Sequence, residues 1–204
     1  MENGNKLNLS EFNWINPPDQ SFVENERLTV ITDPETDFWQ RTYYGFQHDN
    51  GHALVKETKG DFTLVVKTDF EPGAQYDQCG IILYLDSENW VKASVEYEDT
   101  EFARLGSVVT NLGFSDWAST DIPSAANSMW YRFSRREQDF CIENSSDGAT
   151  YQQMRVFHMH LPVMAARIGV YACSPKKSRL KASFSNFELG LCIWPDPENI
   201  EHLI

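Results

Sequence analysis

Residues 78–117 read QCGIILYLDSENWVKASVEYEDTEFARLGSVVTNLGFSDW, and this stretch decides the fold. Side chains of a β-strand alternate between the two faces of a sheet. With a three-residue turn at 87–89, one face of the resulting hairpin is apolar and carries Ile81, Leu83, Leu85, Val91, Ala93, Val95 and Tyr97. A two-residue turn would set Leu83 beside Lys92, which is a poorer pairing. We therefore predict antiparallel strands with an apolar back.

The opposite side of these strands, which we call the front face, mixes aromatic rings with charged groups. It carries Gly80, Ile82, Tyr84, Trp90, Lys92, Ser94, Glu96 and Glu98. Rings among carboxylates and a lysine suit the binding of a polar ligand, so the front face is where we expect function.

Strand-like segments separated by turn residues recur along the whole chain. They are residues 27–32, 52–58, 61–70, 103–111, 129–136, 140–144, 167–172 and 180–189. Many strands at this spacing, with no long helical period, predict an all-β sandwich of two antiparallel sheets. No linker or repeat divides the chain. We expect one domain over residues 1–204, with a short C-terminal tail from about residue 191.

Charge and composition exclude several classes of partner. The chain is 41% apolar and 23% charged, and its net charge is −13 with a pI near 4.7. The densest basic group is Lys176 and Lys177 followed by Arg179. Nucleic acids and anionic membranes are bound by basic patches. We expect neither as a partner.

The four cysteines indicate a reducing compartment. Cys79, Cys141, Cys173 and Cys192 are far apart and lie in or beside strand-like segments, where cysteine acts as a small apolar residue. The first ten residues have neither a basic leader nor an apolar core. We expect reduced thiols and a cytoplasmic protein.

An ordered series of short segments resembles a known family. It includes YDQCG at 76–80, DSENWVK at 86–92, SVVTN at 107–111, WYRF at 130–133 and GVYACSP at 169–175. These segments resemble a domain family of unassigned activity related to the "regulation of enolase" proteins, within the concanavalin A-like lectin/glucanase superfamily. The chain also resembles the sandwich domains appended to some β-xylosidases.

The resemblance implies a concanavalin A-like jelly roll with one concave sheet and leaves the reaction unassigned. Family members often carry a tryptophan shortly after a Ser-x-Asp-Gly turn. This chain has Thr150 and Tyr151 there. Tyrosine can still stack on a partner.

The first candidate site is a carbohydrate site on the front face. Sugars present apolar C–H faces and hydroxyl groups, so their sites pair aromatic platforms with hydrogen-bonding side chains. The expected ligand-binding residues are Tyr84, Trp90, Lys92, Glu96, Asn111, Trp117 and Arg132. Lys92 and Glu96 lie about 13 Å apart along one strand, which can bracket a sugar. The alternative is a solvated face whose charges pair with neighbours.

The second candidate is glycoside hydrolysis by Glu96 with Glu98 or Glu101. Retaining and inverting enzymes hold two carboxyl groups about 5–5.5 Å or about 6.5–9.5 Å apart. The Cα atoms of Glu96 and Glu98 are about 6.6 Å apart on a strand, so this spacing is feasible. Glucanases of the superfamily carry a Glu-x-Asp-x-x-Glu pattern. Here Glu98 replaces the central aspartate.

Metal and arginine sites have weaker support. His158 and His160 share a strand face, but a catalytic zinc site needs a third protein ligand. His48 and His52, and the loop carboxylates Asp33 and Asp37, could hold a cation only if folding brings them together. Arg132, Arg135 and Arg136 follow Trp130. For Arg132, an ion pair with a carboxylate such as Glu96 is favoured over an acidic sugar.

The sequence has no esterase elbow, phosphate-binding loop, dinucleotide fingerprint or paired Cys-x-x-Cys motif. We expect no metal and no cofactor. Carbohydrate binding is the leading hypothesis, a protein-interaction or regulatory module is the second, and hydrolysis is the third.

Overall fold

The structure, a computed structural model, describes residues 5–6 and 8–196. One sheet has eight strands in the order β15-β14-β13-β8-β17-β4-β3, with β1 beside β17. Its strands are β1 (Asn5–Lys6), β3 (Gln20–Glu24), β4 (Arg27–Ile31), β8 (Phe62–Glu71), β13 (Ser128–Arg136), β14 (Asp139–Ser145), β15 (Gln152–His158) and β17 (Lys181–Gly190). All pairings between these strands are antiparallel.

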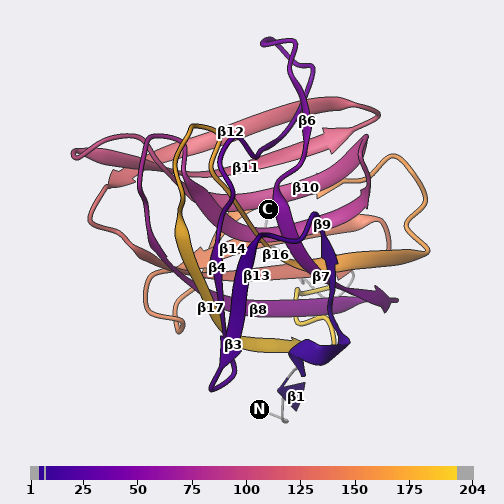
Figure 1. The fold of residues 1–204 in the computed structure, drawn as a ribbon. Helices are drawn as coiled ribbons and strands as arrows, with labels where there is room; N and C mark the ends of the chain where they lie inside the picture. The colour runs from indigo at the N-terminus through magenta and orange to yellow at the C-terminus, as the bar shows by residue number, and fades with distance from the viewer. Residues whose placement is uncertain (1–4, 7, 197–204) are drawn as a thin grey trace.

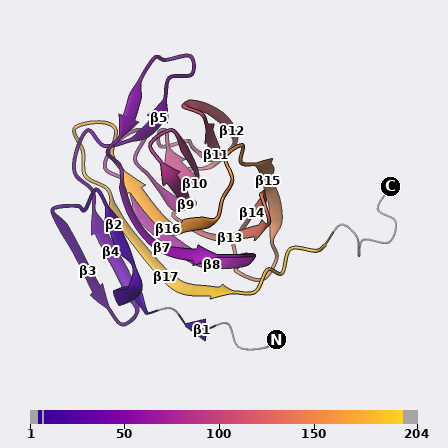
Figure 2. The ribbon, with the colours of Figure 1, turned by 90° about the vertical axis from the view of Figure 1, so that its right-hand side faces the viewer.

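The second sheet has seven strands in the order β12-β11-β10-β9-β16-β7-β2. They are β2 (Asn13–Ile15), β7 (His52–Lys59), β9 (Gln78–Asp86), β10 (Asn89–Tyr97), β11 (Phe102–Asn111), β12 (Phe114–Pro123) and β16 (Ala165–Cys173). A separate hairpin of β5 (Phe38–Gln40) and β6 (Gln47–Asp49) stands out from the body at the top of both ribbon views (Figures 1 and 2). A 3-10 helix at Leu9–Glu11 precedes β2.

The two large sheets pack face to face around one apolar layer. From the seven-stranded sheet, Ile81, Leu83, Val91, Ala93 and Val95 are fully buried in it. The eight-stranded sheet contributes Phe62, Leu64, Val66 and Phe70 to the same layer. This confirms the predicted apolar back of residues 81–95 and the predicted all-β sandwich of two antiparallel sheets.

The turn between β9 and β10 differs from the predicted one. β10 begins at Asn89, opposite Asp86, and the register then shifts between Asn89 and Trp90. Trp90 lies opposite Tyr84 and Val91 opposite Leu83. A bulge of one residue changes the register by one. The two-residue turn and the bulge together therefore preserve the predicted faces, although the three-residue turn was wrong.

The described part of the tail stays on the body. The backbone N–H of Ile193 donates to the Thr63 hydroxyl, and Arg136 donates to the carbonyl of Trp194. The expected tail continues into residues 197–204, which lie outside the described residues. The single domain over 1–204 remains a prediction. Within residues 5–6 and 8–196, no helix is long and apolar enough to cross a membrane.

Candidate functional site

The front face of the seven-stranded sheet holds a cavity of about 510 Å³. Its floor is formed by side chains of β9 and β10. One wall comes from the β5–β6 hairpin and the other from β11 and β12. The lining includes Asp37, Trp39, Tyr44, Phe46, Tyr76, Gln78, Lys92, Ser94, Glu96, Glu98, Arg104, Gly106, Ser107, Val108, Trp117 and Pro175. We call this cavity the front pocket.

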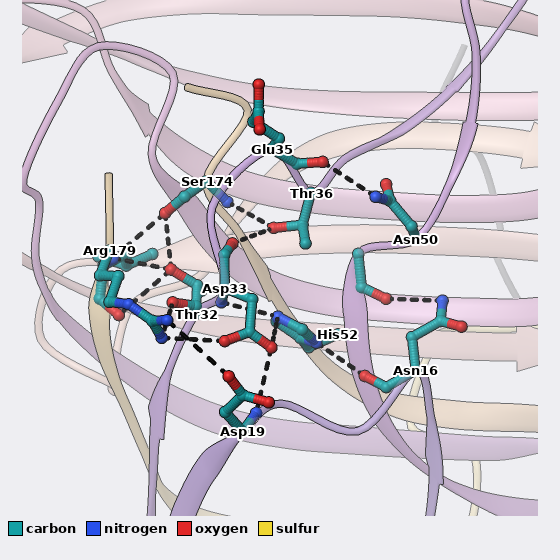
Figure 3. Close-up of polar contacts among 12 residues, drawn as sticks. Asn16, Asp19, Thr32, Asp33, Glu35, Thr36, Asn50, His52, Ser174 and Arg179 are labelled. Carbon is teal, nitrogen blue, oxygen red and sulfur yellow. Dashed lines mark hydrogen bonds and ion pairs between the residues drawn. The ribbon is translucent and has the colours of Figure 1, made fainter. Parts of the chain in front are cut away.

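A polar network fixes the segment that leads from β4 into the hairpin (Figure 3). His52 on β7 contacts the carbonyl of Asn16 through Nδ1 and the backbone N–H of Asp33 through Nε2. Because a carbonyl can only accept, Nδ1 carries the proton and Nε2 accepts. Thr36 donates to the Asp33 carbonyl, and Arg179 donates to the Asp33 carboxylate. The network therefore fixes the position of Asp37 and the start of the hairpin.

The hairpin places one phenyl ring on the centre of the front face. Phe38 is fully buried, with its ring centre 5.7 Å from that of Trp90 and 6.2 Å from those of Tyr84 and Tyr171. These rings form a second apolar cluster, separate from the layer between the sheets. The predicted direction of Trp90 is thus right, because it points away from that layer.

Trp90 and Tyr84 nevertheless do not line the front pocket, which corrects the prediction that they form a ligand platform. Trp90 has no exposed surface, and its indole N–H donates to the carbonyl of Ser87. Tyr84 is buried, and its hydroxyl donates to Asp49 of the hairpin at 2.8 Å. Phe38 of the hairpin packs against both rings.

A chain of hydrogen bonds forms the polar floor. The buried ammonium of Lys92 donates to Asp37 at 3.2 Å and to Oε1 of Gln78 at 2.9 Å. The Tyr171 hydroxyl also donates to this Oε1 atom, at 2.9 Å. The amide nitrogen of Gln78 donates to Glu96 at 2.6 Å. Lys92 has three N–H donors, so one remains beyond these two hydrogen bonds.

Burial affects the two titratable groups of the floor differently. Burial raises the pKa of Glu96 to about 7, although the charge of Lys92 opposes this. Burial alone would lower the pKa of Lys92, but the nearby carboxylates of Asp37 and Glu96 raise it above its usual value. The floor therefore presents a permanent ammonium and a carboxyl group that binds a proton near neutral pH.

Trp117 forms the outer wall together with an ion pair. Arg104 donates to Glu98 at 2.5 Å, and its guanidinium lies 5.5 Å from the centre of the Trp117 ring. Glu98 also accepts from Gln75. A Cβ atom at Gly106 would lie 2.9 Å from the indole nitrogen, so the missing side chain makes room for the indole. Trp117 remains 39% exposed.

The hairpin wall was not predicted from the sequence. Trp39, Tyr44 and Phe46 line the pocket, and the rings of Tyr44 and Phe46 are stacked at 5.6 Å. The available signal was the density of rings in the segment FWQRTYYGF at 38–46. This segment lacks the period-two alternation of apolar residues that predicts the strands of the two sheets, so that pattern does not identify it.

Of the seven predicted ligand-binding residues, Lys92, Glu96 and Trp117 line the front pocket. Asn111 does not, because its side chain bonds the backbone of His158 and His160. Arg132 lies on β13 of the other sheet, where it forms an ion pair with Glu143 and stacks on Tyr151 at 4.3 Å. The predicted ion pair of Arg132 thus exists, but its partner is Glu143 and not Glu96.

The three glutamates considered for catalysis separate into two groups. Glu96 and Glu98 both line the pocket. Glu101 is exposed in the turn before β11, where its backbone N–H donates to Asp99. Of these three glutamates, only Glu96 and Glu98 are therefore placed for acid–base chemistry in the front pocket.

The histidine and aspartate candidates are bound to other side chains and to the backbone. His158 pairs with Asp139 and lies 6.2 Å from the ring of His160. His48 packs on Phe46, whereas His52 and Asp33 belong to the network of Figure 3. Among the residues that the structure describes, no group of three or more His, Cys, Asp or Glu side chains could hold a metal ion.

Comparisons with known proteins agree on the family and the fold. A family model described as "Protein of unknown function (DUF1349)" matches residues 14–192. "Regulation of enolase protein 1" of Saccharomyces cerevisiae is 35% identical over 93% of this chain and 94% of its own length. The resemblance to the regulation of enolase proteins is thereby confirmed.

Three solved structures share the fold. A functionally unknown protein from Saccharomyces cerevisiae has a TM-score of 0.86 at 35% identity, over 92% of this chain and 100% of that one. The GH43 protein BlXynB from Bacillus licheniformis has a TM-score of 0.69 at 15% identity, over 91% of this chain and 38% of that one. A legume lectin-like domain from Entamoeba histolytica has a TM-score of 0.58 at 9% identity, over 90% of this chain and 91% of that one.

The cover over Trp90 predicts a large difference between two tryptophans. Trp90→Ala should lower the free energy of unfolding by about 3–5 kcal/mol, because it leaves a cavity beneath Phe38. Trp117→Ala should change it by about 1 kcal/mol or less, because that indole is partly exposed. Urea denaturation of both variants tests this. Equal losses would contradict the placement of Trp90 under the hairpin.

The raised pKa of Glu96 predicts a pH-dependent effect on stability. The folded pKa of about 7 exceeds the ordinary value of 4.5. The neutral carboxyl group of Glu96 therefore contributes fully to the free energy of unfolding of the wild type below about pH 4.5. This contribution is lost as the pH rises towards 7. Because Glu96→Gln stays neutral, its free energy of unfolding relative to that of the wild type should rise by about 3 kcal/mol between pH 4.5 and pH 8.

Thermal melts at both pH values measure this difference. Glu98→Gln is the matched control, because it removes an ion pair with Arg104 and should not gain stability at high pH. A gain from Glu96→Gln that is the same at both pH values would contradict the buried, proton-binding carboxyl group.

Proposed function

This chain belongs to the family described as "Protein of unknown function (DUF1349)", and from that premise we propose that its front pocket binds a carbohydrate or a related polyhydroxylated ligand. The observation that carries the proposal is the arrangement of the pocket. Trp39 and Trp117 stand on its two walls, and the hydrogen-bonding groups of Gln78, Lys92 and Glu96 lie between them. Rings suit the C–H faces of a sugar, and the floor suits its hydroxyl groups.

The charges of the pocket support a neutral ligand. Lys92 is paired with Asp37 and Arg104 with Glu98. The nearby carboxylates of Asp37 and Glu98 already balance these two cations, so the pocket offers no uncompensated positive charge to an anion. The lectin-like and GH43 names of two structural neighbours are compatible with sugar recognition, although similarity of fold alone does not assign it.

A protein-interaction or regulatory role is the second candidate. It is favoured by the name of the 35% identical yeast relative, "Regulation of enolase protein 1". Exposed rings of the hairpin could serve a protein interface as well as a sugar.

Hydrolysis is the third candidate, because a carboxyl group with a pKa of about 7 is suited to acid–base catalysis. It predicts release from aryl glycosides that is lost in Glu96→Gln.

We also propose a cytoplasmic location. Among the described residues all four cysteines are free, and Cys79, Cys141 and Cys173 are buried. Free thiols suit a reducing compartment.

Loss of the Trp117 indole should weaken sugar binding without unfolding the protein. Trp117→Ala should weaken the retained glycans on an array by at least about tenfold, because stacking and burial of an indole face contribute on the order of 1.5 kcal/mol. Phe22→Ala is the control, since Phe22 is an exposed ring on β3 of the other sheet. Retention of no glycan by the wild type would contradict carbohydrate binding. Co-purification of a protein lost in Trp117→Ala would favour the second candidate.

A further inference from the structure

The aromatic surface of the β5–β6 hairpin extends beyond the front pocket. Trp39, Tyr44 and Phe46 line the pocket, and Tyr44 lies 5.4 Å from Trp39 and 4.9 Å from Tyr43. Tyr43 does not line the pocket and is 93% exposed. Neighbouring rings therefore lead from the pocket wall to the tip of a hairpin that stands out from the body (Figures 1 and 2).

The tip of the hairpin is held in an unusual backbone conformation. Arg41, Tyr43 and Gly45 have φ values of 55°, 62° and 73°. The left-handed region costs a tyrosine or arginine about 1–2 kcal/mol per residue. Short backbone hydrogen bonds close the tip, including Arg41 N–H to Phe46 O and Gly45 N–H to Arg41 O. The fold thus retains strain where it presents an exposed ring.

Arg41 anchors the hairpin to the sheet beside the pocket. Its guanidinium donates to Glu88 at 2.6 Å and to the carbonyl of Gly113 at 2.9 Å. The backbone N–H of Gln40 donates to the Ser115 hydroxyl. These contacts join the hairpin to the turns after β9 and β11 and to the start of β12. The rings are therefore in place before a ligand arrives, which lowers the entropy cost of binding.

The charges around these rings indicate what kind of chain could lie there. The cations that line the pocket, Lys92 and Arg104, are both paired with carboxylates, and the protein as a whole has a net charge of −13. An anionic chain would be repelled, whereas a neutral one would not. A ligand that follows the rings outward from the polar floor must also expose an apolar face in each unit. Chains of neutral sugars meet both conditions.

We propose that the front pocket takes a neutral oligosaccharide, with one sugar residue flanked by Trp39 and Trp117 and a later residue stacked on Tyr43. This inference rests on the proposed carbohydrate binding and adds the class of ligand and an outer subsite. The outer subsite makes affinity depend on chain length. Tyr43 acts only on ligands long enough to reach it.

The experiment compares a monosaccharide with longer chains. An array of neutral and acidic glycans, from single sugars to hexasaccharides, identifies the series, and calorimetry then measures the affinity of each member of that series. The wild type should bind the tetrasaccharide at least about tenfold more tightly than the monosaccharide. Tyr43→Asn should weaken the tetrasaccharide by about threefold to tenfold, the range expected for one stacked ring, and leave the monosaccharide unchanged.

Asparagine is the chosen replacement because it tolerates the left-handed backbone of residue 43, so the tip keeps its shape. Tyr43→Phe keeps the ring and should bind like the wild type. Phe22→Ala, on the other sheet, should have no effect. Thermal melts of all three variants confirm that they are folded.

Failure of this inference and failure of the proposed function give different results. Equal affinity for single sugars and chains, or equal weakening of both by Tyr43→Asn, overturns the outer subsite but leaves sugar binding intact. A preference for acidic glycans overturns the neutral ligand class. Binding to no glycan on the array contradicts the proposed function itself, and this inference with it.

Discussion

The buried ammonium of Lys92 is the constraint on which the front face depends. An unpaired charge at this position would cost several kcal/mol, so the fold has to supply acceptors. It does so with Asp37 and Gln78, which come from the hairpin segment and from β9. To bring Asp37 over Lys92, the chain between β4 and β7 must cross the front face. That crossing places Phe38 against Trp90 and forms the side of the front pocket that is lined by Trp39.

The sequence was sufficient to predict the layers of the sandwich because that information is local. Ile81, Leu83 and Val91 share one parity along the strands, the opposite parity carries Tyr84, Trp90 and Lys92, and only one assignment of faces buries all three apolar residues between the sheets. The bulge at Asn89 and Trp90 could not be read from this pattern. It did not disturb the prediction, because a shorter turn and one extra residue leave the same side chains on each face.

The candidate site was less predictable because contacts distant in sequence determine it. Lys92, Glu96 and Trp117 were found from strand parity, but parity gives only the direction of a side chain and not what covers it. Trp90 points as predicted and is still inaccessible, because Phe38 comes from a segment more than fifty residues earlier. Asn111 and Arg132 show the same limit. Each has a plausible side chain, and each is held by partners that only the folded chain brings near.

The pairing of charges in the pocket restricts what its chemistry can be. Lys92 keeps a raised pKa and is bound to Asp37, so it is not poised as a neutral amine nucleophile. Arg104 is held by Glu98, which also accepts a hydrogen bond from Gln75. This leaves Glu96 as the one floor carboxyl group with a pKa near neutral among the described residues. A single such group can donate a hydrogen bond to a hydroxyl group and accept one in return. Two-carboxylate hydrolysis requires a second carboxyl group, and the oxygens of Glu98 already accept hydrogen bonds from Arg104 and Gln75. These contacts leave Glu96 as the floor group suited to hydrogen-bond a hydroxyl group, which agrees with the binding function proposed above.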